Sequence, residues 1–283
     1  MTIAVTGATG QLGRLIVEDL LAAGIAPGEI VATGRNAERL AELAARGVRT
    51  VPVGYDDLAG LTEAFAGVDT VVLVSGTDFG RRVAQHANVV AAAEAAGATR
   101  VVYTSIPHAD TSEHVLASEH RATEEVIRAS GLAWTLLRNN WYTENKVPTI
   151  AQARATGAIL SATGSGRTAS ASRADYAAAA AAVAIGTGHE GRTYELTGDV
   201  AWTYDELAAT LEDVLGTPVV HKQVSTSELA AALAEAGLDD GTIAFLVALD
   251  EGTARGDLAE TTSDLRTLIG RPTTPLADTL RAL

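Results

Sequence analysis

The stretch TIAVTGATGQLGRLIVEDLLAAG, residues 2–24, points to the class of fold more directly than any other part of the chain. It begins with a short β-branched run, and Gly7, Gly10 and Gly13 then form a glycine-rich turn. Gly24 supplies a stop after the helix that is expected next. That helix is indicated by apolar residues at i, i+3, i+4 and i+8, which are Leu12, Leu15, Ile16 and Leu20. The stretch therefore predicts a strand, a glycine loop and an amphipathic helix in that order.

Similar β-branched runs recur along the chain, with helical stretches between them. They are EIVATG, RTVPVG, TVVLVS, RVVYTS, AWTLLR and RTYEL. This rhythm predicts an α/β fold with a Rossmann-type, doubly wound parallel sheet and right-handed crossovers. The carboxyl ends of all its strands then meet at one edge, and ligands bind at that edge in such sheets.

The pattern loosens in the second half of the chain, which predicts a second structural unit. We expect residues 1–139 to form the Rossmann domain and residues 140–283 to form mainly a smaller C-terminal α/β lobe. Segments around 173–198 should return to the main sheet. The lobe contains TSELAAALAEAG and DTLRAL, which are helical in pattern, and TPVVHKQV, which resembles a strand. The run YAAAAAAVA predicts a tightly packed helix with Asp175 as its N-cap.

Composition excludes several classes of function. The chain has 21 Lys and Arg against 35 Asp and Glu, a formal net charge of −14, which repels nucleic acid and anionic membranes. It has no cysteine, which excludes disulfides, thiolate nucleophiles and thiolate zinc sites. No apolar run reaches the length of a membrane span and no signal peptide is evident, so a soluble, cytoplasmic protein is expected.

The glycine loop predicts a dinucleotide site. Glycines let the backbone approach a pyrophosphate, and the start of the following helix presents unpaired amides to it. An NAD site usually has an acidic residue about 20 positions further on. The corresponding place reads Thr33-Gly34-Arg35-Asn36, and because Arg35 pairs with a phosphate where a carboxylate would repel it, NADPH is favoured. The alternative for the glycine loop is a purely structural turn, and the alternative for Arg35 is a solvated loop charge.

Hydroxyl-bearing residues follow the fourth and fifth expected strands. At the ligand edge they would line the nicotinamide half of the site, although such residues are also ordinary turn formers. They belong to two short groups, Ser75, Gly76 and Thr77 after one strand and Tyr103, Thr104 and Ser105 after the next.

Several motifs together resemble the NADPH-dependent quinone oxidoreductase type 2 group, an NmrA-like branch of the atypical short-chain dehydrogenases/reductases. They are TGATGQLG, GRN, YTSIPHAD, TLLRNNWYTEN, SRADYAAAAA, HEGRTYEL and IGRPTT, and they extend over nearly the whole chain. The resemblance implies a Rossmann domain, a small C-terminal lobe, bound NADPH and a quinone in the cleft between them.

The resemblance also implies a set of cofactor-binding residues. The loop at the phosphates would comprise Gly7, Gly10, Gln11, Leu12 and Gly13, and Thr6 directly before it is also expected to bind the cofactor. Arg35 would hold the 2′-phosphate, and residues 75–77 would lie along the cofactor. Apart from the resemblance, Arg173 is expected either to reach the cleft or to pair with Asp175. The segment closing over the reactive end would be Asn139, Asn140, Trp141, Tyr142, Thr143 and Glu144.

The chain departs from typical short-chain dehydrogenases at the proton donor. Where these enzymes carry a tyrosine and, four residues later, a lysine, the stretch HVLASEHRATEE has Leu116 and His120, while Ser105 remains. A quinone tolerates this loss, since hydride addition generates a delocalised anion that takes its proton from water. We expect Ser105, Asn139 and Asn140 to position the ring. His120 either faces the cofactor or is a structural histidine.

Three choices stay open at this level. Trp141 and Tyr142 either stack on a flat substrate or pack the hinge between the domains. His108, His114 and His120 lie close in sequence, but without a recognisable ligand motif no metal site is expected. Besides a quinone reductase, the chain fits a non-catalytic NADP(H)-sensing regulatory binding protein, or a reductase of a flavin or other planar heterocycle. A homodimer is left open.

Overall fold

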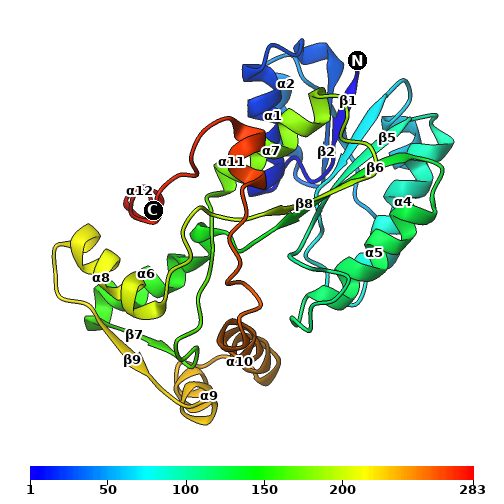
Figure 1. The fold of residues 1–283 in the computed structure, drawn as a ribbon. Coiled ribbons are helices and arrows are strands. Elements are labelled where there is room, and N and C mark those ends of the chain that lie inside the picture. The colour runs from blue at the N-terminus through cyan, green and yellow to red at the C-terminus, as the bar shows by residue number, and fades with distance from the viewer.

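The computed structural model describes residues 1–283 and contains a seven-stranded sheet flanked by helices (Figure 1). The strands lie in the order β3-β2-β1-β4-β5-β6-β8, and every pair of neighbours is parallel. This confirms the predicted doubly wound sheet. The strands are β1 (Ile3–Val5), β2 (Ile30–Gly34), β3 (Arg49–Pro52), β4 (Thr70–Leu73), β5 (Arg100–Ser105), β6 (Ala133–Asn139) and β8 (Arg192–Leu196).

The order of the strands reverses beside β1, and this sets the place of the ligand cleft. Ile3 of β1 pairs with Ile30 of β2 on one side and with Thr70 of β4 on the other. The crossovers on the two sides of β1 run in opposite directions, so the loops at the carboxyl ends of β1 and β4 leave a crevice between them.

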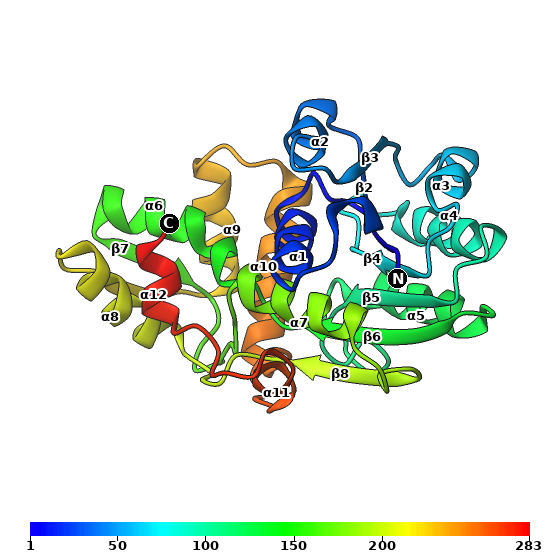
Figure 2. The same cartoon turned by 90° about the horizontal axis from the view of Figure 1, so that it is seen from above.

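Helices cover both faces of this sheet, each over its own apolar core. Figure 2 shows α1 and α7 side by side on one face. The helices of that face are α1 (Gln11–Ala22), α2 (Ala37–Ala44), α7 (Arg173–Ile185) and α11 (Asp264–Ile269). The helices of the other face are α3 (Leu58–Ala64), α4 (Arg82–Ala95) and α5 (Ala117–Ala129).

Helix α1 has the apolar face that its spacing predicts. Leu12, Ile16 and Leu20 are buried against the sheet, and Leu15 packs at the edge of the same core. The helix ends at Ala22, and Gly24 follows with φ +89°, a backbone conformation that glycine adopts without steric cost.

The N-terminus of α7 differs from the prediction. Ser172, not Asp175, is the N-cap, and its hydroxyl accepts from the Asp175 amide at 3.1 Å. Asp175 instead lies fully buried in the first turn, where it pairs with Arg271 at 2.7 Å and accepts from the Thr274 amide. Its carboxylate therefore fastens the C-terminal segment to the helix. The alternative pairing of Arg173 with Asp175 is absent.

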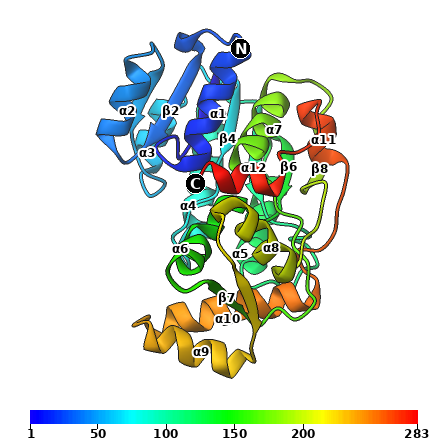
Figure 3. The same cartoon turned by 90° about the vertical axis from the view of Figure 1, so that its left-hand side faces the viewer.

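The remaining elements form a smaller lobe with a core of its own around Trp202, Leu207 and Leu211 (Figure 3). Its two-stranded parallel sheet pairs β7 (Ala158–Ser161) with β9 (Val220–Gln223). The predicted strand and the two predicted helices of this region are confirmed. Its helices are α6 (Val147–Thr156), α8 (Tyr204–Leu215), α9 (Thr226–Glu235), α10 (Asp240–Arg255) and α12 (Leu276–Arg281), and short 3-10 turns occur at η1 (Pro27–Glu29) and η2 (Thr143–Lys146).

The chain passes between the two units more than once. After β7 it returns through α7 and β8, which pack with the main sheet, and the exact boundary at residue 139 stays a prediction. None of the helices combines the length and the apolar character that crossing a bilayer requires.

Candidate active site

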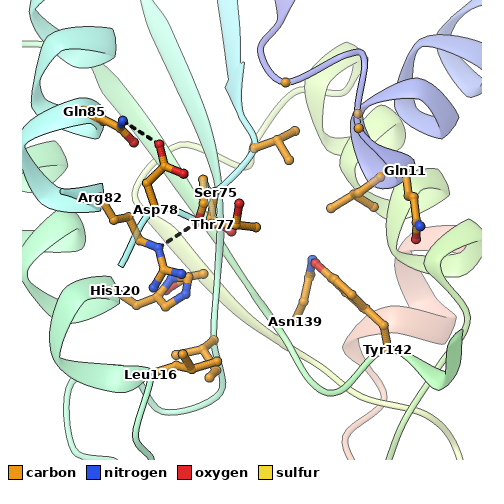
Figure 4. Close-up of a pocket in the computed structure, with 18 of the residues that line it drawn as sticks. Gln11, Ser75, Thr77, Asp78, Arg82, Gln85, Leu116, His120, Asn139 and Tyr142 are labelled. Carbon is orange, nitrogen blue, oxygen red and sulfur yellow. Dashed lines mark hydrogen bonds between the residues drawn. The ribbon is translucent and has the colours of Figure 1, made fainter. Parts of the chain in front are cut away.

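A cavity of about 550 Å³ lies at the carboxyl ends of the central strands. It extends from the glycine loop after β1 to the residues that follow β5 and β6, and Leu258 reaches it from far along the chain. Figure 4 shows Gln11 on one side of it and Arg82 and His120 on the other. Its volume is in the range of small-molecule and cofactor sites.

The glycine loop is built for close approach to a ligand. Gly7 has φ +60°, and a Cβ at Gly13 would lie only 2.8 Å from the carbonyl carbon of Gly7. The amides of Gln11, Leu12 and Gly13 donate to no backbone carbonyl, because they form the first turn of α1. Three converging N–H groups and the positive end of the helix dipole suit a pyrophosphate.

Arg35 lies at the mouth of this half of the cavity. Its side chain is 75% exposed, and its nearest carboxylate is Asp78, whose Oδ2 lies 3.8 Å from Nη1. Its stem runs beside Gly54, where a Cβ would approach Arg35 to 3.3 Å. A weak, exposed ion pair leaves the guanidinium available to a phosphate.

Two predicted cofactor-binding residues lie behind the cavity wall instead. The Thr6 hydroxyl lies 2.8 Å from the Tyr55 hydroxyl and accepts from the Val74 amide, which ties the loops after β1, β3 and β4 together. The Thr104 hydroxyl accepts from the Ser75 amide at 2.9 Å. Both hydroxyls are used within the protein, and neither residue lines the cavity.

Thr143 and Glu144 also hold the structure together rather than line the cavity. The Thr143 hydroxyl lies 2.9 Å from that of Ser170. Both carboxylate oxygens of Glu144 accept from the amide of Arg173, at 2.9 and 3.1 Å, which satisfies an orphan donor at the start of α7. These two contacts fix η2 against the start of α7 and the segment that precedes it.

Most of the remaining predicted residues are brought together around the cavity, with Tyr103 just behind it. Asn139 and Tyr142 lie next to each other in Figure 4. The lining residues that were predicted are Gly7, Gly10, Gln11, Leu12, Gly13, Arg35, Ser75, Gly76, Thr77, Ser105, His120, Asn139, Asn140, Trp141, Tyr142 and Arg173.

His120 is a neutral group at this site. Its Nδ1 lies 2.8 Å from the hydroxyl of Tyr103, and the side chain is 5% exposed. Burial, followed by the charges of Arg82, His86 and His114, lowers the pKa of His120 well below its usual value. The neutral imidazole can therefore form hydrogen bonds, but it is not an imidazolium that could act as an acid. Leu116, one turn earlier, lines the same wall and offers neither.

The proton of Ser105 is already committed. Its hydroxyl donates to Glu124 at 2.7 Å, and Glu124 in turn receives two hydrogen bonds from Arg138, at 2.9 and 2.7 Å. Since Glu124 and Arg138 are both buried, this network holds Ser105 in one orientation. Ser105 can therefore accept a hydrogen bond at the cavity, but it has no free proton to donate.

Asn139 and Asn140 differ in which of their side-chain hydrogen-bonding groups have a partner within the protein. The Asn140 amide is used within the protein, since Nδ2 donates to the Leu258 carbonyl and Oδ1 accepts from the Trp141 amide. Asn139 donates to the Tyr142 hydroxyl at 3.2 Å, while its Oδ1 is buried and has no partner. A buried acceptor without a donor is costly, so Asn139 is suited to a ligand N–H group.

The aromatic pair after β6 has two separate roles. Tyr142 packs on Tyr176 with ring centroids 5.2 Å apart, and the guanidinium of Arg173 lies 5.2 Å from its centroid. Tyr142 thus packs the junction of the two units. Trp141 is half-buried and its one aromatic partner is His114, with ring centroids 6.3 Å apart, so its ring is the freer surface.

Several lining residues were missed by sequence reasoning. Arg82, Phe79 and Asp78 come from the segment after β4, which the rule for the ligand edge could have included. Leu258 had no signal in the sequence, because the tertiary fold alone brings it to the cavity. The other missed lining residues are Thr9, Val53, Gly54, Tyr55, Asp56, Val74, Gln85, Ile106, Pro107 and Asn145.

Comparisons with known proteins agree with this geometry. The model of the family described as NAD(P)H-binding matches residues 7–185. Quinone oxidoreductase 2 of Escherichia coli K12 is 45% identical, over 99% of this chain and 98% of that protein. The crystal structure of NADPH-dependent quinone oxidoreductase QOR2 from Escherichia coli, complexed with NADPH, superposes with a TM-score of 0.95 at 45% identity and 99% coverage of both chains.

A second solved structure is similar over an equal length. Triphenylmethane reductase from Citrobacter sp., complexed with NADP(H), is 39% identical to this chain and has a TM-score of 0.94, with 99% of each chain covered.

Proposed function

This chain belongs to the NAD(P)H-binding family, within the group of NADPH-dependent type 2 quinone oxidoreductases, and we propose that it reduces quinones by direct hydride transfer from NADPH. The observation that carries the proposal is one continuous cavity. It joins three unpartnered helix amides and Arg35 at one end to Asn139, Ser105 and a neutral His120 at the other.

The residues present fit NADPH. The amides at the start of α1 would hold its pyrophosphate, and Arg35 its 2′-phosphate. The orphan Oδ1 of Asn139 would accept from the carboxamide N–H of the nicotinamide, which fixes the face of the ring. NADPH supplies a hydride, and the cavity contributes proximity and orientation.

The reactive end also supports a quinone as the acceptor. Neither His120 nor Ser105 holds a proton ready for donation, and the position of the usual tyrosine is occupied by Leu116. Reduction of an isolated ketone without a positioned acid forgoes about 10²–10⁴-fold in rate. A hydroquinone anion is delocalised and takes its proton from water, so it tolerates this site.

Stopped-flow measurement of NADPH absorbance with 1,4-benzoquinone tests the proposal. Multiple turnovers with hydroquinone as the product are expected. Tight binding of NADP(H) with no turnover across several quinones would overturn it and favour the NADP(H)-sensing protein, for which capture of a specific protein partner would then be the positive evidence.

A reductase of other planar, conjugated acceptors is the second candidate. The similarity to triphenylmethane reductase and the half-buried ring of Trp141 at the cavity favour it. Flavins share a flat, delocalised ring system with quinones, and triphenylmethane dyes carry delocalised aryl rings on a propeller-shaped cation. Comparison of kcat/KM for benzoquinone, free flavin and a dye ranks these substrates.

Two properties complete the proposal. The lack of cysteine and the need for an NADPH pool support a cytoplasmic location. A homodimer stays a prediction, which light scattering during size-exclusion chromatography tests directly.

A further inference from the structure

Arg82 is a buried cation in an unfavourable place. It is the first residue of α4 and only 4% exposed, yet it lines the cavity. A helix N-terminus carries partial positive charge, so a guanidinium there is repelled by the dipole as well as desolvated. Because both desolvation and repulsion by the helix dipole destabilise the charge of Arg82, it needs a compensating interaction.

The protein compensates this charge only in part. Nε donates to the Gly76 carbonyl at 2.8 Å, and the ring of Phe79 lies 5.0 Å from the guanidinium carbon. Nη1 lies 3.2 Å from Glu119 Oε2 but without the alignment of a hydrogen bond, so it is a buried donor without an acceptor. Nη2 forms no hydrogen bond with the protein.

The guanidinium lies at the reactive end of the cavity. Figure 4 places Arg82 beside His120 and Thr77, on the side of the cavity away from Gln11 and the glycine loop. Its charge contributes to lowering the pKa of His86 to about 3, after the larger effect of burial. A cation that acts on its neighbours in this way also acts on any charge that forms in the cavity.

We propose that Arg82 is a catalytic residue, which donates from its free N–H groups to the acceptor oxygen as that oxygen becomes an anion. This inference rests on the proposed quinone reduction. In that reaction quinone, NADPH and one proton give hydroquinone and NADP⁺. The quinone gains a hydride, hence two electrons, before it takes a proton from water, and it carries one negative charge in between.

A quinone and a cationic dye differ in the charge that they carry after hydride transfer, so the loss of Arg82 should affect their reduction differently. A cationic triphenylmethane dye becomes neutral when it takes up a hydride, so no anion forms and a nearby cation opposes binding of the dye. Arg82→Met should lower kcat for benzoquinone by about 10²–10³-fold, the usual cost of losing one donor to a developing oxyanion. It should leave reduction of crystal violet unchanged or raise it.

Arg81→Met is the matched control. Arg81 precedes Arg82, is 65% exposed, pairs with Asp56 at 2.8 Å and does not line the cavity. Its loss should change neither rate by more than about twofold, as expected for an exposed pair. Equal losses with quinone and dye in Arg82→Met would show a role in holding the loop after β4, and would overturn the proposal.

Binding of 4-nitrophenol to the NADP⁺ complex gives a readout without turnover. Its phenolate absorbs visible light, and a nearby cation should lower the pKa of the bound phenol by about 1–3 units. The double variant Arg82→Met/Glu119→Gln keeps the local charge balanced and should abolish this lowering. Normal NADPH affinity would show that the variant is folded. If the bound phenol then had the same pKa in the variant as in the wild-type protein, the inference would be wrong.

The two proposals fail in different ways. Absence of quinone turnover in the wild-type protein removes the proposed function, whereas the phenol titration still reports on Arg82. Turnover of quinone together with an unperturbed phenol pKa in the wild-type protein removes only the role of Arg82.

Discussion

At the scale of single residues, we expect Arg35 to determine the preference for NADPH over NADH. The one ion pair of Arg35 is with Asp78, at 3.8 Å, and its side chain is largely in solvent. Replacing Arg35 with Asp should lower NADPH affinity by roughly 10–100-fold or more, because a charge-assisted hydrogen bond contributes about 1.5–3 kcal/mol and repulsion is added to its loss. NADH affinity should rise, since the new carboxylate accepts from the ribose hydroxyl.

Calorimetric titration of both cofactors measures this exchange. Arg46→Asp serves as the control, because Arg46 is also exposed and lies 3.9 Å from Glu18, away from the cavity. Unchanged selectivity in Arg35→Asp would show that the 2′-phosphate is held elsewhere.

His120 tests whether the enzyme needs a dedicated acid. Its pKa is held well below the usual value, so it stays neutral at and above neutral pH. His120→Ala should therefore lower hydride transfer by less than the 10²–10⁴-fold typical of losing a general acid, and the rate should show no step near pH 6.5. Single-turnover rates from pH 5.5 to 8.5 measure both. A larger loss, with a wild-type pH dependence that disappears in the variant, would identify His120 as the acid.

At the scale of elements, the contact between β1, its loop and α1 depends on one missing side chain. A Cβ at Gly13 would meet the backbone of Gly7, which cannot move away as a side chain does. Gly13→Ala should destabilise the fold by about 1–3 kcal/mol, as overpacking does, and weaken NADPH binding by displacing the amides of the loop.

Urea unfolding and NADPH titration measure the two effects together. Gly28→Ala is the control, because a Cβ there meets nothing within 4 Å, and its stability should be unchanged or slightly raised. If the two variants had the same free energy of unfolding and the same NADPH affinity, the loop would accommodate a Cβ at Gly13 and the prediction would be wrong.

Across the whole molecule, buried neutral histidines make stability depend on pH. Burial lowers the pKa of His86 from 6.5 to about 3, and also lowers the pKa values of His114 and His120. In the unfolded chain these groups take up protons as the pH falls through about 6.5, whereas in the folded protein they do not. The stability they contribute is complete above that pH and is lost progressively below it.

Unfolding free energies at pH 7.5, 6.0 and 5.0 should fall in that order, with each such histidine adding up to about 1.4 kcal/mol per pH unit. His86→Gln keeps an acceptor for the Gly76 amide, which now donates to Nε2 at 2.9 Å, and should flatten the slope by up to that amount. An unaltered slope would place the acid sensitivity in other groups.

The local sequence contained enough to predict the sheet, α1 and most of the cavity. Glycine positions, β-branched runs and helical spacing are short-range signals, and the rule that strand ends share an edge assembles them without further information. Arg35 was found in this way because it directly follows a strand, whereas Asn139, which ends β6, was placed at the site by the family resemblance. The N-cap of α7 was misassigned because Ser172 and Asp175 are both good cap residues, and only the backbone shows which one lies outside the helix.

Side-chain direction and distant contacts required the folded chain. Thr6 and Thr104 lie at the expected edge, yet their hydroxyls bind neighbouring loops of the protein, and Glu144 accepts from the first amide of α7 instead of facing a ligand. Leu258 and the unpaired groups of Arg82 and Asn139 owe their places to packing between segments far apart in sequence. Burial and hydrogen-bond partners are properties of the packed molecule, since they depend on every neighbour in space, whereas spacing along the chain depends on the sequence alone.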